Sequence, residues 1–179
     1  MKTQQGKLLK IVFAGALAAM VYVVTLFRFP LLGSKVHFAN AVCLLSGMLL
    51  GPVWGGLAAG LGSALYDAFG GGYDFLNILI TFVSKFAMAW VCGKLLAANL
   101  KKQGQAGPIR TVIAAASGAL TYVALYMLKS LLMYGWAGMI SRFPASIINA
   151  AAAIVAAPIF YHALVPALRS AGILKRIRE

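Results

Sequence analysis

Two of the three acidic side chains in this 179-residue sequence lie seven positions apart, on either side of a run of three glycines. They are Asp67 and Asp74, and Lys85 follows inside the next apolar segment. Hydrophobic residues make up 62% of the chain, so these charges lie among apolar neighbours. A charge within a bilayer is costly unless it is paired or hydrated, which makes such residues functional candidates. The three residues therefore predict a ligand site.

A polar stripe follows the glycines. Asn77, Thr81, Ser84 and Lys85 recur at i, i+4, i+7 and i+8 and so share one face of a helix predicted from Phe75 to about Leu96. In a helix surrounded by lipid, a polar face must point to the protein interior or to a water-filled cavity. We expect the amide and hydroxyl groups to hydrogen-bond ring heteroatoms of a ligand, and the lysine to hold an anionic or hydroxyl group.

The last two apolar segments add polar and aromatic groups in their outer halves. One segment runs from Thr111 to about Tyr134 and the other from about Arg142 to Leu168, with a loop expected at Gly135 to Gly138. The candidates there are Tyr126, Lys129, Trp136, Arg142 and Asn149. Such groups suit a pocket for a small planar molecule, on which aromatic rings stack and to which polar groups bind.

Two alternatives remain open for these residues. Tyr126, Tyr134 and Trp136 also suit an aromatic belt at the membrane surface. Lys85 also suits a structural ion pair with Asp67 or Asp74.

Composition and apolar runs predict one all-α integral membrane domain over residues 1–179. Only 11% of the residues are charged, and six spans of about 20 residues would use nearly the whole chain. The other four segments are expected at Ile11 to Phe27, His37 to Leu50, Val53 to Phe69 and Phe75 to Leu96, with an external loop at Leu31 to Val36. The basic N-terminal stretch is interpreted as a retained first span rather than a cleaved signal peptide.

The net charge of +13 indicates orientation rather than nucleic-acid binding. Eleven of the sixteen basic residues lie near the two ends of the chain or around the polar segment from Asn99 to Arg110. A bias of this kind marks the cytoplasmic side, and it predicts an even number of spans with both termini inside a bacterial-type cell membrane.

Several chemistries are set aside. The sequence has no G-x-x-x-x-G-K-[ST] motif, so we expect no ATP hydrolysis and no cofactor. Ser63 and His162 are expected at different depths, too far apart to form a nucleophile and base. Cys43 and Cys92 lack metal-type spacing and are expected to be buried free thiols, and no metal site is predicted.

A longer pattern resembles a known family. The stretch His37-Phe-Ala-Asn40, then Leu49-Leu-Gly51-Pro52-x-x-Gly55-Gly56 and Gly60-Leu-Gly62-Ser63-Ala64-Leu65-x-Asp67, resembles the substrate-binding (S) components of energy-coupling factor (ECF) transporters. It is most similar to the riboflavin-type branch, which includes proteins assigned to pyridoxine, hydroxymethylpyrimidine and queuosine-precursor uptake. The resemblance covers essentially the whole chain.

The resemblance implies a vitamin-binding subunit without enzymatic activity. Such a subunit takes its ligand from outside, associates with a transmembrane scaffold (T) subunit and two ATPases that use the ATP, and topples to release the ligand inside. The pocket of the family lies among the first external loop and the outer halves of spans four to six. Ala14-x-x-x-Ala18 resembles the small-residue motif that docks on the scaffold, although contact with another helix of the same chain is equally compatible with it.

Two other functions are considered. One is an autonomous homo-oligomeric carrier or channel that assembles through the glycine-rich third segment and transports without ATPases. The other is an intramembrane enzyme, which the separate depths of Ser63 and His162 disfavour.

Overall fold

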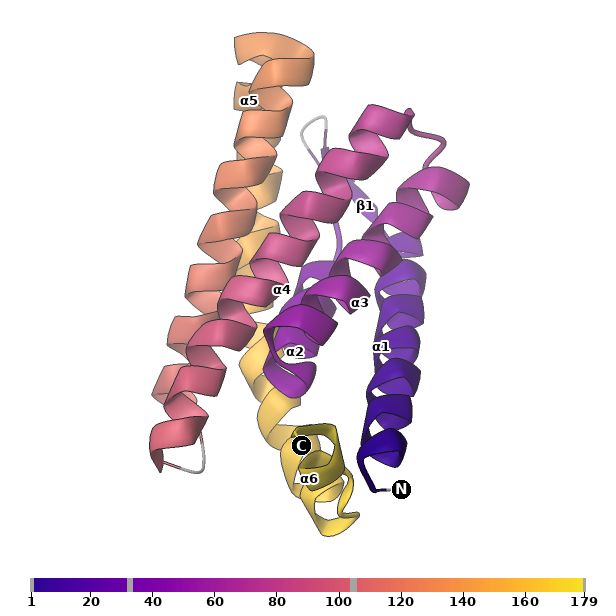
Figure 1. The fold of residues 1–179 in the computed structure, drawn as a ribbon. Coiled ribbons are helices and arrows are strands. Elements are labelled where there is room, and N and C mark those ends of the chain that lie inside the picture. Colours follow the sequence, from indigo (N-terminus) through magenta and orange to yellow (C-terminus); the bar gives the residue numbers. More distant parts are fainter. Residues whose placement is uncertain (1, 32–33, 104–105, 179) are drawn as a thin grey trace.

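The computed structural model describes residues 2–31, 34–103 and 106–178, and these are almost entirely helical (Figure 1). The elements in chain order are α1 (Lys2–Leu26), β1 (Phe29–Leu31), β2 (Ser34–Val36), α2 (Ala39–Leu50), α3 (Pro52–Leu65), the π-helical turn η1 (Tyr66–Gly70), α4 (Phe75–Gln103), α5 (Pro108–Ser170) and α6 (Ile173–Arg178). The all-α fold predicted from the sequence is confirmed.

The centre of the bundle is the short helix α2. All twelve of its residues are buried, and it packs against α1, α3, α4 and α5. A helix that is apolar on every side is expected inside a protein, and the sequence ANAVCLLSGMLL has no charged residue. The remaining helices therefore surround α2 and form its core contacts.

Glycines allow α2, α3 and α4 to approach one another closely. A Cβ atom added at Gly47 of α2 would collide with the carbonyl oxygen of Ala89 in α4. One added at Gly93 of α4 would lie 2.7 Å from the carbonyl oxygen of Gly47. Gly47 and Gly93 thus allow tight packing of α2 against α4, because backbones can touch only where side chains are missing.

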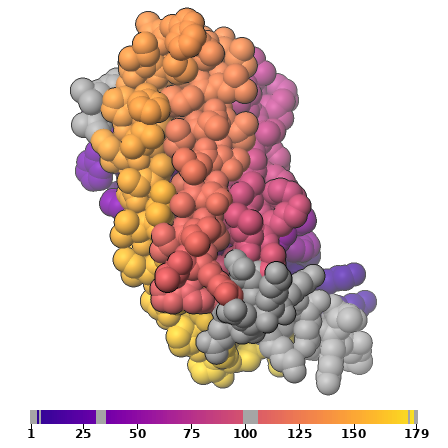
Figure 2. Space-filling model, turned by 90° about the vertical axis from the view of Figure 1, so that its left-hand side faces the viewer, coloured from indigo at the N-terminus to yellow at the C-terminus, as the bar shows by residue number. Residues whose placement is uncertain are grey.

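Helix α5 is a hairpin of two helical arms. Gly135, at φ 66° and ψ −171°, is the only non-helical residue within it, so the arms cover residues 108–134 and 136–170. Figure 2 shows the arms side by side, and a contact of 3.1 Å between Thr111 Oγ1 and His162 Nε2 joins them near their far ends. Glycine adopts positive φ without steric cost, so one residue makes the turn. The expected loop from Gly135 to Gly138 is therefore wrong beyond its first residue.

Other boundaries also differ from the sequence-based predictions. The expected external loop at Leu31 to Val36 belongs to an antiparallel hairpin in which Phe29 pairs with Val36, and its tip, at residues 32–33, lies outside the described residues. The polar segment after α4 is shorter than expected, because α4 continues to Gln103 and α5 begins at Pro108.

Three described helices are long and apolar enough to cross a membrane: Gly6–Leu26, Phe75–Ala98 and Pro108–Ser170, the last of which is the hairpin. Helix α2 is apolar but shorter. Figure 1 places both chain ends at one end of the bundle and the bend of α5 at the other. Six membrane spans and their orientation stay predictions.

Candidate functional site

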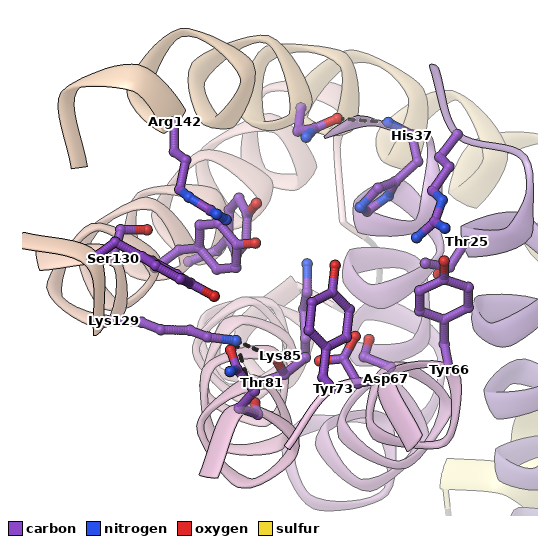
Figure 3. Close-up of a pocket in the computed structure, with 17 residues that line it drawn as sticks. Thr25, His37, Tyr66, Asp67, Tyr73, Thr81, Lys85, Lys129, Ser130 and Arg142 are labelled. Carbon is purple, nitrogen blue, oxygen red and sulfur yellow. Dashed lines mark hydrogen bonds between the residues drawn. The ribbon is translucent and has the colours of Figure 1, made fainter. Parts of the chain in front are cut away.

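A cavity of about 190 Å³ lies near the bend of α5, at the end of the bundle opposite the chain termini. Its walls come from the end of α1, the turn η1, the first half of α4 and both arms of α5. The lining residues are mostly polar or aromatic: Thr25, Arg28, His37, Ser63, Tyr66, Asp67, Tyr73, Asn77, Thr81, Lys85, Tyr122, Tyr126, Lys129, Ser130, Tyr134, Arg142 and Asn149. Figure 3 shows side chains from these elements pointing into a common hollow.

Lys85 is the most enclosed cation of this wall, with 5% of its surface exposed. Its Nζ atom donates a hydrogen bond to Oδ1 of Asn40, which is fully buried in α2. The same ammonium lies 4.0 Å from the centroid of the Tyr122 ring, a cation–π contact. An amide oxygen and a ring face stabilise the charge while leaving further N–H donors of the ammonium for a ligand.

Lys129 connects α5 to α4 across the cavity. Its Nζ atom donates to Oγ1 of Thr81 at 2.9 Å and to the backbone oxygen of Asn77 at 3.3 Å. All three side chains are buried. The Thr81 hydroxyl and the Asn77 backbone oxygen, both on α4, therefore position the Lys129 side chain of α5.

Asp74 supports this arrangement from outside the cavity. Its carboxylate accepts hydrogen bonds from the backbone N–H of Asn77 at 2.9 Å and from its side-chain amide at 2.7 Å. These bonds, the backbone one first, hold the pKa of the Asp74 carboxyl below its usual value. The residue caps the start of α4, where a carboxylate satisfies free N–H groups and favours the helix dipole.

Two arginines rest on tyrosine rings. The guanidinium carbon of Arg142 lies 4.1 Å from the Tyr134 centroid, and that of Arg28 lies 5.3 Å from the Tyr66 centroid. Neither side chain donates a hydrogen bond to a described residue, and the Nη1 atom of Arg28 is buried from solvent. Both guanidinium groups therefore keep donors available at the cavity wall.

The β-hairpin is tied to the second arm of α5. The backbone N–H of His37, directly after β2, donates to Oδ1 of Asn149 at 2.9 Å. Asn149 was predicted to bind ligand, and in this structure its amide oxygen also fixes the segment that follows the hairpin. This bond joins residues 112 positions apart and closes one side of the cavity.

Eight of the ten predicted binding residues line the cavity, and two do not. The eight are Asp67, Asn77, Thr81, Lys85, Tyr126, Lys129, Arg142 and Asn149. Asp74 caps α4 instead, and Trp136 lies just after the bend of α5 with 68% of its surface exposed. Trp136 lies at the start of the second helical arm, because the helix resumes directly after Gly135 where an external loop over Gly135 to Gly138 was expected. Contact of any of the ten residues with a ligand stays a prediction.

Ala14 and Ala18, the predicted scaffold-docking pair, lie in the hydrophobic core with 9% and 8% of their surfaces exposed. A Cβ atom added at Gly62 of α3 would collide with the carbonyl oxygen of Ala18, so α1 and α3 are in close contact here. The pair therefore packs within the chain, which is the alternative that the motif left open.

Sequence reasoning missed several lining residues. Arg28 and Tyr73 were not singled out because they lie outside the predicted helical segments, and Tyr66 was not singled out within the apolar segment Val53 to Phe69. One signal was present: Arg28 is a basic residue at the end of the first span that faces away from the basic termini. Ser63, considered as a nucleophile, lines the cavity, whereas His162 contacts Thr111 at the start of α5. Cys43 and Cys92 are buried free thiols, as predicted.

A bundle of apolar helices enclosing a small polar cavity is typical of membrane proteins that bind small molecules. Residues 6–166 match the model of the family described as ECF-type riboflavin transporter, S component, and the chain belongs to that family. This confirms the resemblance seen in the sequence and makes the chain a vitamin-binding subunit of a transporter, which is not an enzyme class.

A relative from Pyrococcus woesei, described as an uncharacterized protein in the gap 3′ region, is 24% identical over 140 residues. The similarity covers 76% of this chain and 88% of the relative. The two chains are thus similar over most of their lengths.

Proposed function

We propose that this chain captures a small vitamin or vitamin precursor at the outer face of a cell membrane and delivers it to ATP-driven partner subunits. The observation that carries the proposal is the polar, tyrosine-lined cavity at the end of the bundle opposite the termini. Family membership supports the vitamin class. The ligand types to compare are riboflavin, pyridoxine or hydroxymethylpyrimidine, and queuosine precursors.

The proposed topology has six spans with both termini inside. Two arms of α5 and the helices α1 and α4 supply four, and the short helices α2 and α3 with η1 supply two more. Both chain ends lie at one end of the bundle, where most of the basic residues of the sequence are found. The positive-inside rule then places that end in the cytoplasm and the cavity near the outside.

The proposed partners are a transmembrane scaffold subunit and two ATPases, which use the ATP. Because Ala14 and Ala18 are buried, docking through α1 requires its other small-residue stripe. Gly15 and Ala19 are exposed, and a Cβ atom added at Gly15 would meet no atom within 4 Å. Gly15→Leu is expected to reduce co-purification of the scaffold and ATPases, whereas ligand affinity stays unchanged. Equal co-purification would remove this stripe from the docking surface.

Uptake by reconstituted proteoliposomes tests the proposed function. We expect this chain alone to bind vitamin without moving it, and we expect uptake when scaffold, ATPases and ATP are added. An autonomous homo-oligomeric carrier would transport without them. ATP-independent uptake by the purified chain would therefore contradict the proposal.

A further inference from the structure

The charges that line the cavity do not balance. Among the lining residues that the structure describes, four side chains are cationic, Arg28, Lys85, Lys129 and Arg142, and one is a carboxylate, Asp67. With His37 neutral, these described residues carry a formal charge of +3. Uncompensated charge is costly in a partly enclosed site surrounded by apolar helices. A ligand that brings negative charge would offset that cost.

The four cations differ in how far the protein satisfies them. Lys129 donates to Thr81 and Asn77, and Lys85 donates to Asn40 and lies on the ring of Tyr122. In contrast, neither guanidinium group donates a hydrogen bond to any residue that the structure describes, and Arg28 Nη1 is also shielded from solvent. The unused donor capacity is therefore concentrated on the two arginines.

The tyrosine rings orient these arginines. A guanidinium that lies on an aromatic face presents its N–H groups at the edge of its plane, where a carboxylate or phosphate accepts two bonds at once. Arg142 lies on Tyr134, from the first arm of α5, and Arg28 lies on Tyr66 of η1. Figure 3 shows the side chains of Arg142 and Lys129 extending into the hollow from the same side. This arrangement suits an oxyanion.

The volume limits the size of the ligand. About 190 Å³ is below the roughly 300–1,000 Å³ typical of sites for drug-sized ligands. Such a space suits one substituted ring better than the fused three-ring system of a flavin. The neighbouring rings of Tyr122 and Tyr126, with centroids 5.3 Å apart and planes tilted by 33°, supply an aromatic wall for a planar ring.

We propose that the cavity takes a small planar anion, a single ring bearing a carboxylate or phosphate group, for which Arg142 and Arg28 supply positive charge and N–H donors. This inference rests on the proposed function and narrows its ligand class. The proposed ligand is anionic, whereas riboflavin, after which the family is named, is a neutral flavin. The aromatic walls hold the ring, and the cationic lining selects for the charge.

Matched single-ring probes test the proposal. The intact chain, in nanodiscs of phosphatidylcholine alone, is titrated with benzoate, phenyl phosphate and the neutral benzyl alcohol, and saturation-transfer NMR reports binding. We expect saturable binding of at least one anion, and at least tenfold weaker binding of the alcohol.

Arg142→Gln and Arg28→Gln should each weaken binding of the anion about tenfold or more. Lys94→Gln, which removes an exposed cation lying on Trp90, should leave it unchanged.

Other outcomes overturn the proposal. Absence of saturable anion binding, equal binding of benzyl alcohol, or arginine variants that fold and bind like the wild type would each do so. A repeat with phosphatidylglycerol in the nanodiscs separates a soluble ligand from a lipid headgroup, because competition by this anionic lipid would show that a headgroup takes the site. Saturable binding of riboflavin without binding of either anion would contradict the proposed anionic ligand and would still support the proposed function.

Discussion

At the scale of single residues, Lys85 shows how the protein keeps a charge inside an apolar bundle. The ammonium has an amide oxygen on one side and a ring face on the other, and both groups are buried. Asn40 and Tyr122 come from different helices, so the lysine also links α2, α4 and α5. The charge is thereby held at the cavity wall by groups that do not neutralise it.

Lys85→Gln is expected to weaken ligand binding about tenfold or more, or at least about 1.4 kcal/mol. Glutamine keeps a donor for Asn40 and loses the charge, so the fold should persist. Isothermal titration with the ligand that co-purifies measures the effect, and Lys94→Gln on the same helix is the matched control. Unchanged affinity in Lys85→Gln would remove the ammonium from the binding site.

Asp74 makes a prediction about pH. Its folded-state pKa is lowered by the bonds from Asn77, so its contribution to stability is present above the unfolded pKa of about 3.9 and is lost as the pH falls through the folded value. The wild type should therefore unfold at a higher temperature than Asp74→Asn at neutral pH. This difference should shrink below about pH 4. Thermal unfolding in detergent at several pH values measures it, and a constant difference would contradict the capping role.

At the scale of elements, close helix contacts place the cavity wall. The contact between α2 and α4 sets where the first half of α4, with Asn77, Thr81 and Lys85, faces the first arm of α5. It depends on Gly47, whose missing side chain leaves room for the backbone of Ala89.

Two glycine substitutions separate packing from helix propensity. Gly47→Ala is expected to lower the free energy of unfolding by about 1–3 kcal/mol, because the added methyl group meets backbone that cannot move aside. Gly15→Ala, in open space on α1, should instead raise it by about 0.5–1 kcal/mol. Thermal or denaturant unfolding of both variants tests the pair. Equal effects would show that the close contact is not decisive.

The π-helical turn is an element that the sequence did not indicate. It continues α3 by one wider turn and carries Asp67 and Tyr66 into the cavity lining. Insertions of this kind occur often at functional sites, where they redirect a side chain. Nothing in residues 66–70 distinguishes a π-helical turn from an α-helical one by spacing or propensity.

At the scale of the whole molecule, much of the site was predictable because lipid surroundings penalise misplaced charge. Five basic residues depart from the positive-inside pattern, and Arg28, Lys85, Lys129 and Arg142 among them line the cavity. The polar stripe of α4 was predictable from its period for the same reason. Contacts between distant segments could not be predicted from the sequence, because they depend on tertiary packing. Examples are the bond between His37 and Asn149 and the burial of Ala14 and Ala18.

For the whole molecule, we propose that the cavity holds a small molecule for delivery to partner subunits. Native mass spectrometry of the purified protein tests this most directly, with the wild type and Lys85→Gln compared side by side. We predict one small molecule per wild-type chain and a much lower occupancy in the variant. A wild type and a variant that carry the same molecule to the same extent, or a ligand-free wild type that transports without ATPases, would contradict the account.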